Sequence, residues 1–253
     1  MDLKALDSAT KYPSIETYHK LGDKGRLTEE PNFTFEGDAL LTLKVDGTNV
    51  RIIHLPDGDW FIGVREHLLY GRGDRVRNAF EGVLDHLIPV AEGLAPHGGD
   101  MVQVYYLEVY GGTVGSQAKQ YSASRLMGHR LFDVALVPLE VLQRPVTEIS
   151  SWRQNGGQGF FNESMLRRFA DAEGFALTPR LDVLDAQDLP TSLDGMDRLL
   201  RKTDYRMGEV VLDEGAGAVP EGVVVRTLDR RTIAKARLQD YERTLRAPSG
   251  KGR

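Results

Sequence analysis

Lys44, followed by Val45-Asp46-Gly47, is the part of the sequence with the clearest chemical potential. A neutral lysine amine can attack phosphorus, but the pKa of an unperturbed lysine is about 10.4. A nucleophilic lysine therefore needs nearby positive charge or partial burial to become neutral. Aspartate followed by glycine is also a frequent turn, so these four residues alone fit either a nucleophile or an ordinary hairpin.

Two cations further along the chain could favour a neutral amine. Lys235 and Arg237 are two residues apart in a short apolar run, so in a strand both side chains point to one face. Ala234 and Ala236 then point to the other face. We predict that Lys235 and Arg237 project into the site of Lys44 and bind phosphate; the alternative is a pair of exposed strand charges.

Carboxylates are the next requirement of such chemistry. Transfer of a phosphorus group depends on positioning and charge neutralisation, so a divalent metal held by carboxylates is expected. Glu221 and Asp46 are the candidate metal ligands, and Mg²⁺ (or Mn²⁺) is the expected ion. The alternative for Glu221 is a loop carboxylate after Pro220.

The elements that must position these residues begin with strands. Alternating apolar residues from Ala39 predict a strand that ends near Lys44. Asp46-Gly47 then predicts a turn, with returning strands at Asn49 to Leu55 and Trp60 to Arg65. Together these form a predicted three-stranded antiparallel meander.

The rest of the chain alternates between helix and strand patterns. The fold class that this predicts is α+β, with antiparallel β-sheets flanked by helices, in a single domain over residues 1–253. The predicted helices are Asp74 to Leu94, shortened or kinked at Pro89, then Asn162 to Ala172, Leu193 to Lys202 and a short one from Leu238. The further predicted strands are Met101 to Val109, His129 to Leu136, Gly222 to Thr227 and Ile233 to Arg237.

Five segments, in this order, resemble the motifs of the covalent nucleotidyltransferases, the superfamily of ATP-dependent DNA ligases, RNA ligases and mRNA capping enzymes. The resemblance spans most of the chain and implies a ligase adenylylation fold with a nucleotide attached covalently to Lys44. The segments are Lys44 to Gly47, Glu108 to Gly111, Phe132 within Arg130 to Val134, Glu221 to Arg226, and Lys235 to Arg237.

Three features resemble the RNA ligase branch most closely. They are Tyr12-Pro13-Ser14-Ile15-Glu16, the Thr48-Asn49 pair after Gly47, and Glu108-Val109-Tyr110-Gly111. The resemblance implies that Glu108 binds the ribose hydroxyls and that Arg65 contacts the ribose or a phosphate. It also implies that Phe132 stacks on the purine and that Gly47, Thr48 and Asn49 help to bind the nucleotide. The alternatives are a salt-bridged arginine for Arg65 and a core position for Phe132.

The resemblance implies an ATP-dependent RNA ligase that forms a lysyl-AMP intermediate and joins 5′-phosphate to 3′-hydroxyl ends, in RNA repair. The alternatives are a DNA ligase, a capping-type guanylyltransferase, or a non-catalytic protein that binds nucleotide or RNA ends. Some ligases carry an acidic residue just before the nucleophile, whereas Thr42 and Leu43 stand there in this chain. The choice of ATP over GTP therefore depends on the RNA ligase resemblance.

Sixteen residues follow Arg237, so we expect no appended OB-fold domain and allow for a protein partner that supplies the missing C-terminal function. The expected substrates are RNA ends, including nicked duplexes. The net charge of −5 disfavours a protein that coats nucleic acid but permits a local basic patch. The absence of cysteine excludes disulfides and thiolate sites. Without a signal peptide or an apolar membrane span, the expected location is the cytoplasm, with no membrane partner.

Overall fold

The computed structural model describes residues 1–75 and 82–246, and these form two compact units that the chain enters more than once. The larger unit comprises Met1–Ser14, Asp46–Leu177 and Val211–Ala218. The smaller unit comprises Ile15–Val45, Thr178–Val210 and Val219–Arg253. Whether the two units act as a single domain stays a prediction.

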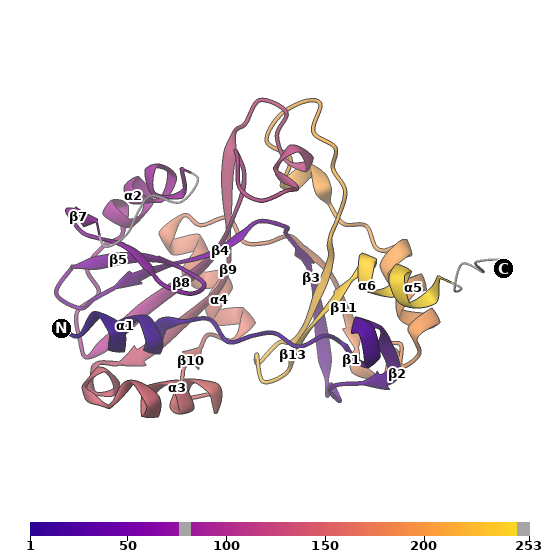
Figure 1. The fold of residues 1–253 in the computed structure, drawn as a ribbon, viewed down its shortest axis with the longest axis horizontal. Coiled ribbons are helices and arrows are strands. Elements are labelled where there is room, and N and C mark those ends of the chain that lie inside the picture. Colours follow the sequence, from indigo (N-terminus) through magenta and orange to yellow (C-terminus); the bar gives the residue numbers. More distant parts are fainter. Residues whose placement is uncertain (76–81, 247–253) are drawn as a thin grey trace. The chain divides into compact units, whose positions relative to one another are not determined.

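A seven-stranded antiparallel sheet forms the centre of the larger unit (Figure 1). Its long strands β8 and β9 are apolar over most of their length because helices cover both faces of the sheet. In spatial order the strands are β10 (Gly159–Phe160), β9 (Met127–Pro138), β8 (Met101–Gly111), β4 (Thr48–His54), β5 (Trp60–Val64), β6 (Leu68–Gly71) and β7 (Asp74–Arg75).

Each face of this sheet has its own hydrophobic core. On the first face, α2 (Val83–Gly93) and α4 (Glu163–Glu173) pack over β4, β5, β8 and β9. On the second face, α1 (Leu3–Thr10) and α3 (Val146–Gln154) pack over β4, β8 and β9. Val50 and Ile52 of β4 face the first core, and Ile53 faces the second, as strand alternation requires.

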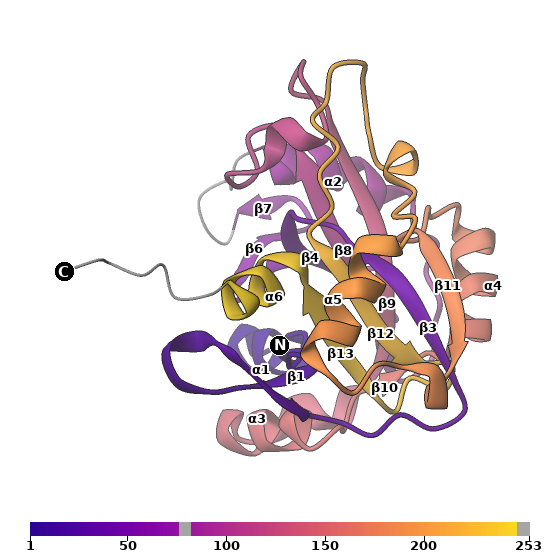
Figure 2. The same cartoon turned by 90° about the vertical axis from the view of Figure 1, so that its right-hand side faces the viewer.

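The smaller unit is built on a four-stranded antiparallel sheet (Figure 2). Its strands are β11 (Arg180–Asp185), β3 (Asp38–Lys44), β12 (Gly222–Thr227) and β13 (Ile233–Arg237), in that order. The helices α5 (Leu193–Lys202) and α6 (Leu238–Leu245) contact each other and the two-stranded sheet of β1 (His19–Leu21) and β2 (Leu27–Pro31). The fold class predicted from the sequence, α+β with antiparallel sheets flanked by helices, is confirmed.

The predicted meander is wrong in its first step. The strand that ends at Lys44 pairs with β11 and β12 and not with β4, whereas β4 pairs with β5 and β8. Asp46-Gly47 is therefore a connection between two different sheets and no hairpin turn. Ala39 to Leu43 are all buried, as is typical of a strand in the interior of a sheet, and β11 and the valine-rich β12 are the two neighbours that satisfy its backbone.

The predicted helix from Asp74 to Leu94 is correct only in its second part. Asp74–Arg75 pair with β6 as a short strand after the turn at Arg72-Gly73, where Gly73 has a φ of 74°. The predicted residues 76–81 lie outside the described part of the chain. α2 begins after Gly82 and continues past Pro89 to Gly93. The predicted helices at 162–172, 193–202 and from 238 are confirmed.

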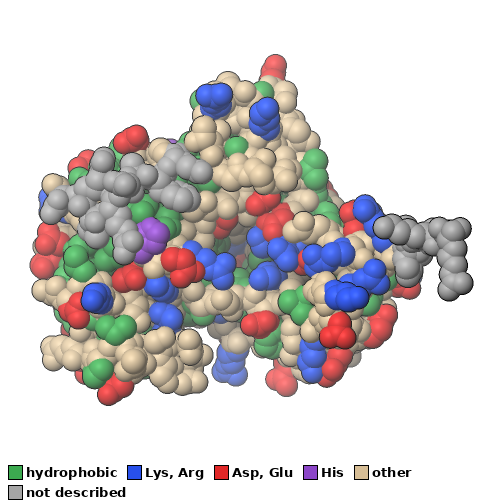
Figure 3. Space-filling model, viewed as in Figure 1, with side chains coloured by type: hydrophobic (Ala, Val, Ile, Leu, Met, Phe, Trp, Pro, Cys, Tyr) green, Lys and Arg blue, Asp and Glu red, His purple; other side chains and the backbone are tan. Residues whose placement is uncertain are grey.

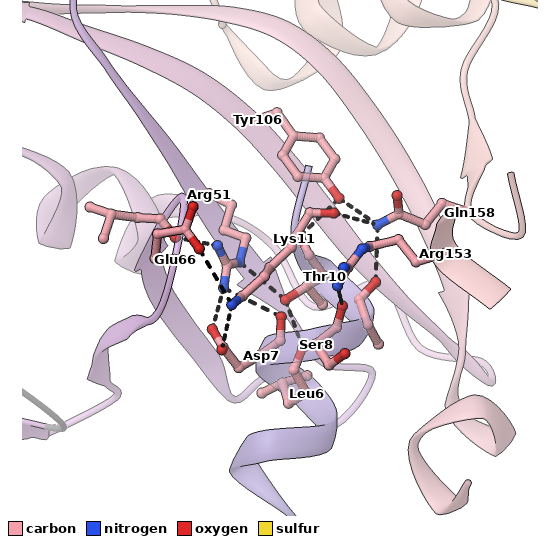
Figure 4. Close-up of polar contacts among 12 residues, drawn as sticks. Leu6, Asp7, Ser8, Thr10, Lys11, Arg51, Glu66, Tyr106, Arg153 and Gln158 are labelled. Atoms are coloured by element: carbon pink, nitrogen blue, oxygen red, sulfur yellow. Dashed lines mark hydrogen bonds and ion pairs between the residues drawn. The ribbon is translucent and has the colours of Figure 1, made fainter. Parts of the chain in front are cut away.

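α1, which the sequence did not predict, is fixed through the carbonyl oxygens of its last turn (Figure 4). These carbonyls have no partner inside the helix and need outside donors. Arg51 contacts the Asp7 carbonyl at 3.5 Å and the Asp7 carboxylate at 2.5 Å, and Tyr106 donates to the Thr10 carbonyl at 3.0 Å. The remaining donors are Arg153 to the Ser8 carbonyl and Gln158 to the Ala9 and Lys11 carbonyls.

Arg51 is fully buried, and burial lowers its pKa, a shift that the charge of Asp7 opposes. Its guanidinium also donates to the Thr10 hydroxyl at 3.1 Å and to the Val64 carbonyl. A cation at a helix C-terminus also interacts favourably with the helix dipole. Arg51 therefore anchors α1 to the sheet through contacts that a hydrophobic residue cannot replace.

A pair of partly buried histidines joins α2 to β9. His86 Nε2 and His129 Nδ1 are 2.9 Å apart. Burial, together with the charges of His86 and Arg130, lowers the pKa of His129 to about 4, and burial also lowers the pKa of His86.

In the part of the chain described here, no helix is long and apolar enough to cross a membrane.

Replacing Arg51 should destabilise the protein strongly. In Arg51→Ala the partly buried Asp7 carboxylate and the α1 carbonyls lose their donor, which we expect to cost about 2–4 kcal/mol in the free energy of unfolding. Urea denaturation followed by circular dichroism measures this change. Arg144→Ala removes an exposed i,i+4 pair with Glu140 and serves as the control, with an expected cost of about 0.5 kcal/mol or less. Equal losses in the two variants would contradict a structural role for Arg51.

Stability should fall as the pH drops from about 6.5 to about 4, because the unfolded chain binds a proton on His129 before the folded chain does. The expected loss from this residue is about 3 kcal/mol at pH 4, and none above pH 7. His129→Gln should reduce the slope of unfolding free energy against pH, whereas exposed His97→Gln should keep it. Parallel slopes for wild type and His129→Gln would rule out this assignment.

Candidate active site

Lys44, Lys235 and Arg237 lie on the same face of the four-stranded sheet. The register sets Lys44 of β3 opposite Gly222 of β12, and Gly222 opposite Arg237 of β13. Lys235 lies one step along the same face, opposite Val224. Ala234 and Ala236 are buried on the other face, at most 1% exposed. The structure therefore brings the three predicted cations together on one side of one sheet.

The amine of Lys44 forms an ion pair with Glu221. Lys44 Nζ lies 2.5 Å from Glu221 Oε2, and the two side chains are 25% and 12% exposed. Glu221 immediately precedes β12, so the register that sets Lys44 opposite Gly222 also brings the carboxylate to the lysine. Gly222 has a φ of 151°, and a Cβ there would lie 2.1 Å from the Ala236 carbonyl oxygen, so only glycine fits this position.

Arg237 is held by a carboxylate that the sequence analysis did not identify. Its guanidinium donates to both carboxylate oxygens of Asp240, at 2.7 and 3.1 Å. Asp240 belongs to the first turn of α6, is 1% exposed and also accepts from Arg243 at 2.9 Å. Asp240 thus fixes the orientation of Arg237, and the buried carboxylate is balanced by two arginines.

The backbone of Lys235 forms hydrogen bonds with Glu16, the last residue of the Tyr12–Glu16 motif, and with Tyr18. Lys235 donates its N–H to the Glu16 carbonyl at 2.9 Å and accepts from the Tyr18 N–H at 2.8 Å. Thr17 therefore forms a parallel β-bridge with Lys235, along the outer edge of β13 in the four-stranded sheet.

The Asp46-Gly47 connection is fixed within the larger unit by side chains. The Gly47 N–H donates to Glu108 Oε1 at 3.1 Å, and the Asp46 N–H donates to the Tyr121 hydroxyl at 2.7 Å. A Cβ on Gly47 would lie 2.2 Å from the carbonyl oxygen of Val109, so only glycine fits at this position. Glu108 thus orients this connection, in addition to its predicted ribose contact.

Asn49, Glu108 and Phe132, three of the residues predicted to bind the nucleotide, lie on one face of the seven-stranded sheet. Asn49 lies directly opposite Glu108 in the pairing of β4 with β8, on the face of the second core. Phe132 of β9 packs against that same core. Thr48 begins β4 opposite Val109. The Asn49 side-chain oxygen is buried and has no hydrogen-bond partner in the described residues, so it remains available to a ligand.

Phe132 and Arg65 have structural neighbours of their own. The ring of Phe132 lies edge-on to that of Tyr12, with centroids 5.0 Å apart, in a cluster with Tyr106. Arg65 follows β5, is 63% exposed, donates to the Ser14 hydroxyl at 3.1 Å and pairs with Glu66 at 3.7 Å. Tyr12 and Ser14 of the N-terminal motif thus contact two of the predicted nucleotide-binding residues.

The metal prediction can be compared with the acidic residues. Among residues 1–75 and 82–246, no group of three or more histidine and carboxylate side chains could hold a metal ion. Magnesium bound to a nucleotide typically uses only one or two protein carboxylates, together with phosphate oxygens and water. The Glu221 carboxylate beside Lys44 fits that requirement within the smaller unit.

Tyr121 and Asp213 are site-related residues that the sequence analysis missed. Asp213 accepts hydrogen bonds from Ser122 Oγ, from the Ala123 N–H and from both the N–H and the hydroxyl of Ser124. These bonds, the two serine hydroxyls first, lower the pKa of Asp213. They fix the loop after Tyr121, the residue that holds Asp46. No pattern in the sequence identified either residue.

A family model for RNA ligases matches residues 38–237, which include Lys44 and Arg237. The chain therefore belongs to the RNA ligase family. No curated protein matches the chain significantly in sequence.

Solved structures of RNA ligases share this fold at low sequence identity. An archaeal ATP-dependent RNA ligase is 15% identical with a TM-score of 0.54, over 91% of this chain and 49% of that chain. A Naegleria gruberi RNA ligase mutant solved with ATP and Mn is 13% identical with a TM-score of 0.52, over 92% and 62% of the two chains. Another mutant of that enzyme, solved with AMP and Mn, is 14% identical with a TM-score of 0.51, over 90% and 60%. The chain thus spans 49–62% of the length of these structures.

Gly47→Ala should disturb the Asp46-Gly47 connection. The added Cβ would collide with the Val109 carbonyl, and separating the two segments should cost about 2 kcal/mol or more in unfolding free energy. Thermal and urea unfolding of the variant measure the loss. Gly93→Ala at the end of α2, where a Cβ meets nothing within 4 Å, is the matched control and should be neutral or slightly stabilising. A neutral Gly47→Ala would contradict the close approach.

Proposed function

We propose that this chain is an ATP-dependent RNA ligase that carries AMP on Lys44. The observation that supports this most directly is the placement of Lys44 on one sheet face with Lys235 and Arg237, its amine paired with Glu221. A lysine flanked by cations and one carboxylate is suited to attack a polyphosphate. Membership of the RNA ligase family and the relatives solved with ATP, AMP and Mn support the choice of nucleotide and metal.

In the first step, Nζ of Lys44 attacks the α-phosphorus of ATP. The new N–P bond replaces the bond to the bridging oxygen, pyrophosphate leaves, and the amine loses a proton. Because lysine attacks only as a neutral amine, the proton shared with Glu221 must leave Lys44 first. Glu221 is the group placed to hold that proton. Lys235 and Arg237 bind phosphate oxygens, and Asp240 keeps Arg237 oriented toward them.

Two further steps would complete ligation. A 5′-phosphate oxygen of RNA attacks the phosphorus of lysyl-AMP, the N–P bond breaks, and Lys44 regains its proton. A 3′-hydroxyl then attacks the 5′-phosphorus, losing its proton as AMP leaves, and a phosphodiester forms. A divalent cation, Mg²⁺ or Mn²⁺, would neutralise phosphate charge in these steps, with Glu221 as its supported ligand and Asp46 as a further candidate.

The nucleotide would be bound by residues of the larger unit. Glu108 is assigned to the ribose, Phe132 to the purine, Arg65 to ribose or phosphate, and Gly47, Thr48 and Asn49 to the remaining contacts. The unpartnered oxygen of Asn49 supports its part in this assignment. The proposal therefore predicts that substitutions at these residues impair formation of the adduct.

Because the chain spans 49–62% of the solved ligases, activity as a complete ligase is a separate proposal from adenylylation. A protein partner that supplies a C-terminal function is part of that separate proposal. A role in RNA repair in the cytoplasm, on broken or nicked RNA, fits an enzyme that joins ends. A DNA ligase and a capping-type guanylyltransferase remain the alternatives.

Incubation with magnesium and α-labelled ATP should label the protein covalently, as seen on a denaturing gel. Lys44→Ala should abolish the label because the nucleophile is gone, and Glu221→Gln should slow labelling by about 10²-fold or more. Lys202→Ala, which removes an exposed lysine of α5, should leave labelling at the wild-type rate. Label that persists in Lys44→Ala would refute the role of Lys44, and label from GTP in place of ATP would indicate capping chemistry.

A further inference from the structure

A basic pocket of about 370 Å³ lies in the larger unit, at the lower end of the size range of ligand sites. Three cations and one carboxylate line it: Lys11 after α1, Arg65 after β5, Arg153 of α3, and Glu66. The remaining lining residues are Tyr12, Pro13, Ser14 and Gln154. Three separate chain segments thus bring positive charge to one hollow.

The cations at the mouth of this pocket retain donors for a ligand. Lys11 Nζ lies 3.4 Å from an Asp7 carboxylate oxygen and 3.9 Å from one of Glu66 (Figure 4). In the described residues it makes ion pairs but no hydrogen bond, and Arg65 donates only to Ser14. Ammonium groups and planar guanidinium groups that have spare N–H donors are the usual binders of phosphate.

Hydrogen bonds hold the segments that carry Lys11 and Arg153. Arg153 donates to the Ser8 carbonyl, and burial lowers its pKa. Gln158 and Tyr106 hold the backbone of residues 9–11, and buried Arg51 holds Asp7. The position of Lys11 is therefore set by a network of buried hydrogen bonds, and a ligand would meet a preformed site.

Lys44, Glu221, Lys235, Gly47 and Glu108 are not among the lining residues, and Arg65 is the one nucleotide-binding candidate that is. On the face of the molecule in Figure 3, several basic side chains gather near the middle of the view with acidic ones around them, and the net charge of the whole chain is −5. An acidic protein that acts on RNA needs local positive charge, which this pocket supplies. The pocket thus adds to the proposed nucleotide site without repeating it.

We propose that the pocket of Lys11, Arg65 and Arg153 binds a phosphate group of the RNA strand, with Glu66 limiting the affinity. This assignment rests on the proposed function for its substrate. Phosphate groups of ATP are the alternative source of the same chemistry. The two sources differ in whether changes in the pocket alter the binding of RNA or of ATP.

The test is binding of a 3′-labelled, 5′-phosphorylated single-stranded RNA, measured by fluorescence anisotropy without nucleotide over a range of salt. Lys11→Gln should weaken binding about 3- to 10-fold and reduce the salt slope by about 0.7, the value for one lost phosphate contact on a single strand. Glu66→Gln should strengthen binding by about 2- to 5-fold, because it removes the carboxylate that competes for Lys11 and Arg65.

The Lys20–Glu30 ion pair of the smaller unit provides matched controls, since its side chains are 44% and 67% exposed. Lys20→Gln and Glu30→Gln should change RNA affinity less than the pocket variants do. Equal effects from both pairs would overturn the proposal, and so would a loss of ATP binding in calorimetry with RNA binding intact. If RNA affinity changes in the pocket variants as expected but no lysyl adduct forms from ATP, only the proposed ligase function fails. If the adduct forms but RNA affinity is unchanged in the pocket variants, only the pocket assignment fails.

Discussion

Pairing of β3 with β12 places Lys44 opposite Gly222, and the charged surroundings of the lysine follow from that register. Glu221 reaches the amine because it stands one residue before Gly222, and Arg237 joins the same row because β13 pairs with β12. A slip of one residue would turn Lys44 into the buried face and replace it with Leu43. Such a slip would bury the charge of Lys44, which costs more than the exchange of one buried side chain for another along Ala39 to Leu43.

In the larger unit, buried polar groups have a comparable role. Arg51, Tyr106 and Gln158 bind the last carbonyls of α1 and thereby fix the segment that carries Lys11, Tyr12 and Ser14. A purely apolar contact would hold the helix but leave those carbonyls without donors. The residues that surround the candidate nucleotide and phosphate contacts are thus positioned by a polar network inside a hydrophobic core, which is more directional than packing alone.

Local patterns in the sequence predicted β8, β9, β12, β13, α4, α5 and α6, because each carries its own periodicity. They could not predict that β3 pairs with β12, a strand almost 180 residues away, because periodicity carries no information about which strands pair. The turn signal at Asp46-Gly47 instead favoured pairing of β3 with the next strand, β4. The role of Arg51 could not be predicted either, because its partners in α1 lie more than 40 residues away and include backbone carbonyls, which any residue type provides. The candidate site residues came from family resemblance, and strand register accounts for the shared face of Lys44, Lys235 and Arg237.

The interleaving of the two units has a consequence for biosynthesis. The four-stranded sheet combines Asp38–Lys44 with Gly222–Arg237, and the larger unit includes Val211–Ala218. During synthesis on the ribosome, β3 is therefore made long before β12, the strand it pairs with. Until β12 is synthesised, the apolar residues of β3 stay exposed. Neither unit corresponds to one continuous stretch of chain, so a truncated fragment would contain unpaired strand edges. A nascent or proteolysed form of this protein is for that reason expected to depend on chaperones and to aggregate readily.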